Sequence, residues 1–557
     1  MSTQPSRHFV TLAGRWGPRQ VHYRRAGSGP AVLLLHQSPQ SSREFEALMR
    51  SWAGDFTLIA PDTPGYGLSD PLPVESAAME DFAAATVEFA DALGLRRFGI
   101  YGYHTGGGMA VALADGWPER VTTIAVNGLV MPTDSELATI LANYLPRFAP
   151  RWDGSHLTWL WARLREQTIF FPWHERHLAN RMDFPVPPPE ALQRNLREFL
   201  HAGDHYRLAY AAAFSYRAAG PLQRLRVPAL ITAARLDPLA AHLQRIGERA
   251  AGVEVSGAAD ADDALARARA QLAGWPGEPP PAPPNARPLP GRIWQDSLPL
   301  PGGSQRLRRS GERIACLLVH AAGASAATLD ELLLALGDAA ALDLPGHGEN
   351  AGDGSDGTLR AAAEHCLAVA AALPADGLLL GGVGSGAWVA VEAARCDPRP
   401  FRALLLQDPP MPDAALADAI RAEGLPSLAP DWHGGHLSRA WHMCRDARLF
   451  HPWFRRDRAS IRWTEPQLDE ARLTLEVREK LSADGCWQAL ARAALDYPWA
   501  EALADLDLPI LACAQASSPW HSAASRLLEQ SDRCRFLSLP DSPADWPELL
   551  RPAAGGL

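Results

Sequence analysis

The sequence predicts an α/β protein made of two tandem domains, each a mostly parallel β-sheet with flanking helices and a helical cap insert. Three observations lead to this prediction: the second half repeats the first, short apolar runs alternate with amphipathic stretches, and a glycine-flanked turn follows a predicted strand in both halves. A chain of 557 residues also exceeds what one hydrophobic core usually supports.

The internal repeat is the strongest organisational signal. One constant offset, the 280 residues between His156 and His436, relates nine residues of the first half to nine of the second. The nine are Trp152, Gly154, His156, Leu157, Trp161, Arg165, Phe170, Pro172 and Trp173, which recur as Trp432, Gly434, His436, Leu437, Trp441, Arg445, Phe450, Pro452 and Trp453. Asp62 pairs with Asp343 at one residue more, so we infer a duplication with a single-residue slip.

Five short apolar runs in the first half are predicted strands, at 31–35, 56–60, 97–101, 121–126 and 229–233. The amphipathic stretch 79–93 is predicted to be a helix. Because strands that alternate with helices form parallel sheets, we expect a sheet covered on both faces. The insert 132–226 carries Trp, Phe and Arg at helical spacing, and we expect it to form a cap above the carboxyl ends of the strands.

The expected domain boundaries follow from the repeat. We expect an N-terminal domain at 1–273 with its cap at about 132–226, and a C-terminal domain at 304–557 with its cap at about 410–505. The segment between them, 274–303, is crowded with proline, which favours extended polyproline conformations. A semi-rigid linker is therefore expected, and a ligand for an SH3-type module is the alternative.

Composition excludes several classes of partner. The net charge of −10 comes without any run of Lys or Arg, so nucleic acid and anionic membranes are not expected to bind. The N-terminus lacks an apolar signal core and no stretch is long enough to cross a bilayer, so a cytoplasmic protein is expected. The seven cysteines lack the spacing of metal ligands, so we expect reduced thiols and no metal site.

The two turns carry the chemistry. Residues 102–106 read Gly-Tyr-His-Thr-Gly, and residues 382–386 read Gly-Val-Gly-Ser-Gly. Both resemble the Gly-x-Ser-x-Gly nucleophile elbow, a sharp turn that lifts its central side chain above the sheet. Neither has serine at the centre, where His104 stands in the first half and Gly384 in the second.

With these turns the first half resembles an α/β-hydrolase of the esterase and epoxide-hydrolase-like kind, over about 21–272. The matching motifs are Leu-Leu-Leu-His at 33–36, Ala-Pro-Asp-Thr-Pro-Gly-Tyr-Gly at 60–67, the turn itself, and the segment from Pro228 to Asp237. The second half resembles the same fold over about 313–552, through the motifs at 317–320 and 343–348.

The resemblance implies roles for single residues of the first half. His104 takes the nucleophile position, the backbone N–H groups of Gln37 and Thr105 would form the oxyanion hole, and Asp237 matches the triad acid. The triad histidine is missing, because the expected loop at 256–260 contains none. In the second half Gly384 replaces the nucleophile, so we expect a catalytically inactive, structural copy that pairs with the first.

Several interpretations of these residues stay open. His104 could be a general base, a nucleophile that forms an acyl-imidazole, or a relic that only binds. Asp237 could orient His104, or could cap a helix ahead of Pro238.

Further candidate substrate-binding residues are His36, Tyr103, His156, Trp161 and Arg165. The alternative for His36 is to hold the oxyanion loop by hydrogen bonds. The last three recur in the second half, so the alternative for them is folding or contact between domains.

The sequence therefore predicts a cofactor-independent, serine-free hydrolase that acts on a small ester, thioester or related acyl bond. The active site is expected in the N-terminal copy, with a small-molecule substrate as the partner and further homo-oligomerisation left open. A non-enzymatic small-molecule binding protein or scaffold is one alternative. A lyase or isomerase that uses His104 as a general base is the other.

Overall fold

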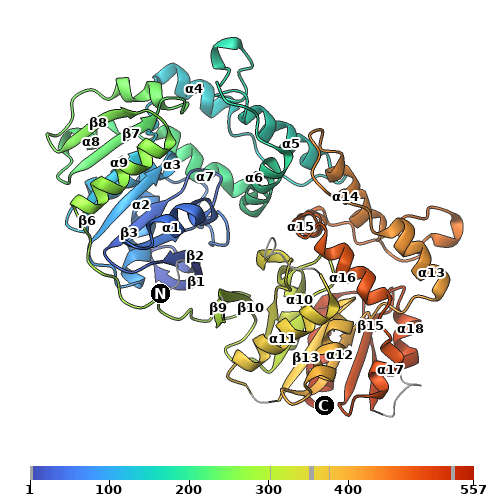
Figure 1. The fold of residues 1–557 in the computed structure, drawn as a ribbon. Coiled ribbons are helices and arrows are strands. Elements are labelled where there is room, and N and C mark those ends of the chain that lie inside the picture. Colours follow the sequence, from blue (N-terminus) through green and yellow to red (C-terminus); the bar gives the residue numbers. More distant parts are fainter. Residues whose placement is uncertain (1–3, 302, 351–356, 376, 528–532) are drawn as a thin grey trace. The chain divides into compact units, whose positions relative to one another are not determined.

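The computed structural model describes residues 4–301, 303–350, 357–375, 377–527 and 533–557 (Figure 1). The chain forms two compact units. The first contains residues 1–149 and 159–287, and the second contains 150–158 and 288–557. The segment 150–158, which was expected in the cap of the N-terminal domain, thus belongs to the second unit.

The first unit is built on an eight-stranded sheet with the order β1-β2-β4-β3-β5-β6-β7-β8. Strands β1 and β2 form an antiparallel hairpin, β2 pairs antiparallel with β4, and all later pairs are parallel. The strands are β1 (Ser6–Gly14), β2 (Gly17–Ala26), β3 (Ala31–Leu35), β4 (Thr57–Pro61), β5 (Phe98–Tyr103), β6 (Val121–Asn127), β7 (Ala229–Ala234) and β8 (Val253–Ala258). The five predicted strands are confirmed, whereas the β1–β2 hairpin was not predicted, because its mixed polar sequence lacks an apolar run.

Helices cover this sheet and form its cap. The helices next to the sheet are α1 (Glu46–Trp52), α2 (Met79–Ala92), α3 (Thr105–Gly116) and α9 (Ala261–Gly274). The insert between β6 and β7 contains α4 (Asp134–Asn143), α5 (Ser155–Gln167), α6 (Pro189–Ala202), α7 (Tyr206–Ser215) and α8 (Ala219–Arg224). The helix predicted at 79–93 is therefore confirmed, and the insert is helical as expected.

The second unit repeats this topology. Its sheet has the order β9-β10-β12-β11-β13-β14-β15-β16, which matches the first sheet strand for strand. The strands are β9 (Trp294–Leu300), β10 (Gly303–Arg309), β11 (Cys316–Val319), β12 (Ala339–Leu342), β13 (Leu378–Val383), β14 (Phe401–Gln407), β15 (Ile510–Gln515) and β16 (Cys534–Leu539). Two tandem copies of one fold are thus confirmed at the level of the sheets.

The helices of the second unit follow the same plan. Those outside the cap are α10 (Asp330–Leu336), α11 (Leu359–Ala372), α12 (Gly386–Cys396), α18 (His521–Ser525) and α19 (Trp546–Gly555). The insert between β14 and β15 includes α13 (Ala414–Ala419), α14 (Gly435–Asp446), α15 (Glu470–Ser482), α16 (Cys486–Leu495) and α17 (Trp499–Ala504).

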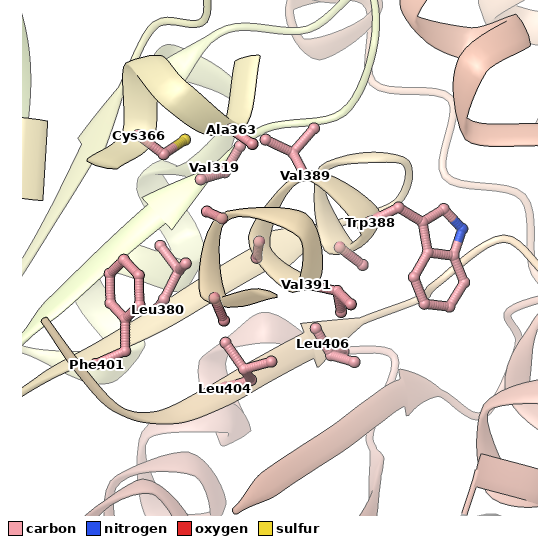
Figure 2. Packing of buried hydrophobic residues seen from close by; sticks show 14 of the residues in the cluster. Val319, Ala363, Cys366, Leu380, Trp388, Val389, Val391, Phe401, Leu404 and Leu406 are labelled. Carbon is pink, nitrogen blue, oxygen red and sulfur yellow. The ribbon is translucent and has the colours of Figure 1, made fainter. Parts of the chain in front are cut away.

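A hydrophobic core cluster of the second unit surrounds α12 (Figure 2). This helix is apolar on nearly every face, as expected for a helix packed between a sheet and further helices. Figure 2 labels Trp388, Val389 and Val391 of this helix and the residues around it, which are Val319, Ala363, Cys366, Leu380, Phe401, Leu404 and Leu406. The cluster anchors the turn at 382–386 between β13 and α12.

The predicted linker 274–303 is structured at both ends. Glu278 bonds through its backbone to Ala31 and Arg97 of the first unit, and the backbone of Arg287 bonds to the Thr11 side chain. Strand β9, which lies inside the predicted range, pairs with β10. The prolines did not prevent these contacts, because carbonyl groups and the intervening non-proline N–H groups still form hydrogen bonds.

Within the described part of the chain, no helix is both long enough and apolar enough to cross a membrane.

Candidate active site

The turn after β5 places His104 in a strained backbone conformation. Its φ of 48° and ψ of −105° lie in a region that side chains other than glycine rarely adopt. Glycine is required on either side, because a Cβ on Gly106 would overlap the Leu35 carbonyl and one on Gly102 would overlap Gly106. The predicted elbow is therefore present in shape, with an imidazole at its apex.

The imidazole of His104 meets the carboxylate of Asp237, which lies 133 residues away in the sequence. The distance from His104 Nε2 to Asp237 Oδ2 is 2.8 Å. The two side chains are 18% and 7% exposed, so the hydrogen bond is largely shielded from water. The other oxygen, Oδ1, accepts the Leu239 N–H at 2.8 Å. Asp237 therefore caps the turn that follows it and also contacts His104, which combines the two roles considered for it.

Asp237 is held as a carboxylate. Burial opposes its ionisation, but the neighbouring His104 and the Leu239 amide outweigh burial and lower its pKa below the ordinary value. An ionised carboxylate accepts a proton donor, so Nε2 of His104 carries the hydrogen. The lone pair of a neutral imidazole then lies on Nδ1.

One of the two N–H donors expected to form the oxyanion hole already has a hydrogen-bond acceptor within the protein. As the first residue of α3, Thr105 has an N–H that finds no acceptor within the helix. The Gln37 N–H, in contrast, donates to Glu44 Oε2 at 3.2 Å, and the Gln37 side-chain amide donates to Oε1 at 2.5 Å. One of the two predicted donors is thus already engaged by a carboxyl group.

Glu44 is the functional candidate that sequence reasoning missed. Burial raises its pKa to about 7, although the hydrogen bonds to Gln37 and the charge of His104 both lower this pKa. Perturbed carboxyl groups of this kind are enriched at active sites. The sequence holds one signal for this residue. Counting from His36 and His320, Glu44 aligns with Thr328, so the carboxyl group occurs at this position in the first copy alone.

A small cavity lies over the elbow. Its volume is about 30 Å³, which holds about two water molecules. The lining residues are Gln37, Ser38, His104, Thr105, Val130, Phe171, Tyr210, Ala213, Phe214, Pro238 and Leu239. The cap supplies the aromatic part of this wall, from the segment before α6 and from α7. Water therefore fits beside His104, whereas a substrate requires the cap side chains to move.

The predicted substrate-binding residues mostly lie elsewhere. His36 is 1% exposed, donates from Nδ1 to the Gln37 carbonyl and accepts the Thr63 N–H at Nε2, which is the loop-holding alternative. Tyr103 packs its ring on that of His104, with centroids 4.2 Å apart.

The cap residues among these predictions do not line the cavity over His104. Nε2 of His156 lies 3.0 Å from the Thr474 hydroxyl oxygen, and both residues belong to the second unit. Trp161 is 1% exposed and Arg165 is partly buried. The cavity wall is built from the next part of the cap, which holds Phe171 and α7.

The elbow of the second copy has the same shape without a reactive group. Gly384 has a φ of 55°, close to that of His104. Ser385 Oγ accepts the Ala322 N–H at 2.7 Å, just as Thr105 Oγ1 accepts the Ser38 N–H at 3.3 Å. Ser385 thus has a structural partner, and no side chain rises at the apex.

The described residues contain no group of three or more His, Cys, Asp or Glu side chains arranged to hold a metal ion.

Comparison with known proteins places the fold. A family model described as the alpha/beta hydrolase fold matches residues 30–251. An uncharacterized hydrolase of Saccharomyces cerevisiae is 34% identical over 107 residues, which cover 19% of this chain and 37% of that protein. Haloalkane dehalogenase 2 of Mycobacterium tuberculosis is 28% identical over 249 residues, 43% of this chain and 71% of that protein.

Among solved structures, an esterase from Exiguobacterium antarcticum is 18% identical with a TM-score of 0.34, and the match covers 44% of this chain and 90% of that one. The chain spans about a third of the length of the first curated relatives that it matches. The family match covers β3 to the residues just before β8, and therefore includes the elbow and Asp237. Residues 30–251 belong to the α/β hydrolase fold family.

Proposed function

We propose that the N-terminal copy is a cofactor-independent hydrolase of a small ester, thioester or related acyl compound, with His104 as general base and Asp237 as the residue that orients it. The apolar lining by Val130, Phe171 and Phe214 favours a small, largely apolar acyl group, which enters once the cap side chains move.

One observation carries this proposal: a strained histidine is kept where the second copy has glycine. A non-glycine residue at positive φ costs of the order of 1 kcal/mol. Gly384 avoids that cost at the same turn, whereas His104 retains it and gains a 2.8 Å bond to Asp237. Strain that is maintained beside an oriented imidazole is typical of a catalytic position.

The reaction follows from the position of the protons. With its hydrogen on Nε2 facing Asp237, His104 takes a proton from water at Nδ1 as the water oxygen attacks the acyl carbon. The carbonyl oxygen becomes an oxyanion, which the Thr105 N–H stabilises. The carboxylate of Asp237 stabilises the imidazolium until it returns the proton to the leaving oxygen or sulfur. The acid product and the alcohol or thiol then leave.

Glu44 favours a second candidate, an isomerase or lyase. Since the carboxyl group engages Gln37, the oxyanion hole expected for acyl transfer is complete only when Glu44 moves. A carboxyl group whose pKa is raised to about 7 can donate a proton to one atom of a substrate while His104 removes one from another. In that reaction no acyl bond breaks.

The test is turnover of a panel of p-nitrophenyl esters and acyl thioesters by the purified full chain. We expect activity that falls by roughly 100-fold or more in His104→Ala, in His104→Gly and in Asp237→Asn. His177→Ala is the matched control, because His177 is an exposed histidine of the same unit.

Equal activity in His104→Ala and the parent chain would overturn the assignment of the base. Absence of turnover together with His104-dependent exchange of a substrate C–H proton into heavy water would favour the isomerase or lyase. Ligand binding without either activity, unchanged in His104→Ala, would favour the non-enzymatic binding protein.

A further inference from the structure

The second copy contains a larger cavity beside the position that the active-site cavity occupies in the first, and the elbow residues Gly384 and Ser385 are not among its lining residues. Its volume is about 420 Å³, against about 30 Å³ in the first copy. The repeat relates several lining residues, since His451 and Trp520 of this cavity correspond to Phe171 and Leu239 of the other. Sites for small organic ligands commonly have volumes of roughly 300 to 1,000 Å³. The second cavity is therefore large enough for a ligand.

Two arginines line this cavity, and both are specific to the second copy. Arg448 and Arg462 take the places of Thr168 and Met182 in the repeat. Arg462 donates from Nη1 to the Ala447 carbonyl at 2.7 Å and from Nη2 to the Ser517 carbonyl at 3.0 Å. Among the described residues no carboxylate forms an ion pair with Arg462. The half-buried guanidinium of Arg462 is therefore hydrogen-bonded to backbone carbonyls, while the Asp408 and Asp541 carboxyl groups act on it only through their charge.

Arg448 adds a second charge nearby. Its guanidinium forms an ion pair with Glu476, while its Nε is buried without a hydrogen-bond partner in the described part of the chain. Burial and the charge of Arg448 lower the pKa of Arg462, whereas the charges of Asp408 and Asp541 raise it, so the repulsion between the two cations is only partly offset. An anion between them would relieve that repulsion.

Asp408 brings a third unsatisfied group to the same cavity. It has a φ of 48° at the position where the first copy has Gly128, whose φ is 75°. Its Oδ1 is buried without a hydrogen-bond partner among the described residues, and burial raises the pKa of its carboxyl.

The rest of the wall is aromatic. Trp453, Phe454, Trp487 and Trp520 all line the cavity, and Trp520 meets His451 edge to face at 5.0 Å. The indole Nε1 of Trp487 is buried without an acceptor within the described residues. Flat apolar groups stack favourably against such side chains, whereas a small inorganic anion would leave the wall unfilled.

We propose that the C-terminal copy is a binding site for a small aromatic carboxylate, with the ring against the tryptophan wall and the carboxylate at Arg462 and Arg448. The site binds and does not turn its ligand over, because Gly384 leaves the elbow without a reactive side chain and no elbow residue lines the cavity. The C-terminal copy then has a receptor function in place of the purely structural role expected from its degenerate motifs.

The experiment uses the full chain and 2-naphthoate, with 2-naphthamide as the uncharged analogue of the same shape. Binding is measured by calorimetry and by the fluorescence of the cavity tryptophans. We expect saturable binding of the carboxylate with a Kd below about 1 mM and at least tenfold weaker binding of the amide. His104→Ala should bind 2-naphthoate as the parent chain does, because the ligand lies in the other copy.

The key variant is Arg462→Met, which introduces the residue of the first copy. It should weaken 2-naphthoate binding at least tenfold, and Trp520→Leu should do the same by removing part of the wall. Arg492→Met is the matched control, an exposed arginine of the same unit. Since Arg462 also holds two carbonyls, circular dichroism checks the fold, and Arg448→Thr tests the anion site independently.

The proposal is overturned by any of four results: no saturable binding by the parent chain, equal binding of acid and amide, loss of binding in His104→Ala, or displacement of 2-naphthoate by equimolar inorganic phosphate. Unchanged binding in both Arg462→Met and Arg448→Thr would also overturn it.

Discussion

At the scale of single residues, two carboxyl groups near His104 have pKa values that are shifted in opposite directions. The pKa of Asp237 is lowered, because the effects of His104 and the Leu239 amide outweigh the effect of burial. The pKa of Glu44 is raised to about 7, because the effect of burial outweighs that of its hydrogen bonds to Gln37. Two titratable groups whose pKa values are shifted in opposite directions by their surroundings are typical of a site that contains both an acid and a base. Each shift also predicts how stability depends on pH.

Asp237→Asn should destabilise the first unit at neutral pH by about 1–3 kcal/mol, the cost of a buried hydrogen-bonded group that loses its charged partner. A carboxyl whose folded pKa lies below the unfolded value of about 4 stabilises the protein above pH 4, and this contribution is lost as the pH falls below it. Urea unfolding at pH 7 and pH 3 should therefore show a deficit that shrinks at pH 3. A constant deficit would contradict the ionised state assigned to Asp237.

Glu44→Gln should have the opposite pH dependence. The folded pKa of about 7 exceeds the ordinary 4.5, so the parent chain loses stability as the pH rises from 4.5 to 7 and stays at the lower value above it. The full shift corresponds to about 3 kcal/mol, and the partial exposure of the side chain makes the effect smaller. The variant should be more stable than the parent at pH 8 and equal to it at pH 4.

Unfolding of Glu44→Gln in urea at the two pH values is the measurement, with the exposed Glu75→Gln as control. A gain of stability that is the same at pH 4 and pH 8 would show that Glu44 ionises normally.

At the scale of elements, the turn after β5 and the turn after β6 carry side chains of complementary size, and the larger side chain is on a different turn in each copy. In the first copy Gly128, after β6, leaves room for the His104 ring, since a Cβ on Gly128 would lie 2.8 Å from Nε2. In the second copy Gly384 frees the same space, and Asp408 stands where Gly128 was. The two turns therefore differ together between the copies: the first copy has an imidazole after β5, and the second has a buried carboxyl group after β14.

Gly128→Ala should displace the His104 ring and reduce turnover by roughly 100-fold, because a misplaced base loses its alignment with Asp237. Gly203→Ala is the control for backbone strain alone. Gly203 also has a positive φ, 53°, but nothing lies within 4 Å of its added Cβ. Activity measured on both variants separates the two effects, and equal losses would mean that strain rather than the clash is responsible.

At the scale of the whole molecule, all seven cysteines lie in the second unit, and all are thiols rather than disulfides. Five are buried, while Cys396 and Cys486 are partly accessible. Burial raises the pKa of the Cys316, Cys366 and Cys444 thiols to about 12. Buried thiols of raised pKa react slowly, because the thiolate is the reactive form.

Labelling of the native chain with a thiol reagent at pH 8 should therefore modify at most two groups rapidly. In urea, the appearance of the other five reports unfolding of the second unit, while His104-dependent turnover reports the first. Rapid labelling of more than two thiols in the native chain would show that the second core is not packed as described.

The sequence alone predicted much of this architecture. The duplication, the five parallel strands and the elbows follow from local patterns, because a strand, a helix or a glycine-bound turn is encoded by neighbouring residues. The β1–β2 hairpin and the paired β9 were missed, since their strands mix polar and apolar residues and carry no apolar run. The segment 150–158 lies in the expected insert between β6 and β7 but groups with the second unit, because a sequence pattern does not reveal what a segment packs against.

The sequence by itself determined that two α/β sheets carry serine-free elbows and that His104 stands at one apex. Only the tertiary structure decided that Asp237 lies 2.8 Å from His104, that Glu44 engages the Gln37 amide, and that the second cavity is lined by two arginines. The physical reason is that sheet order brings the ends of β5 and β7 to one edge, on either side of β6. Contacts between residues so far apart in the chain depend on that packing and leave no local signal.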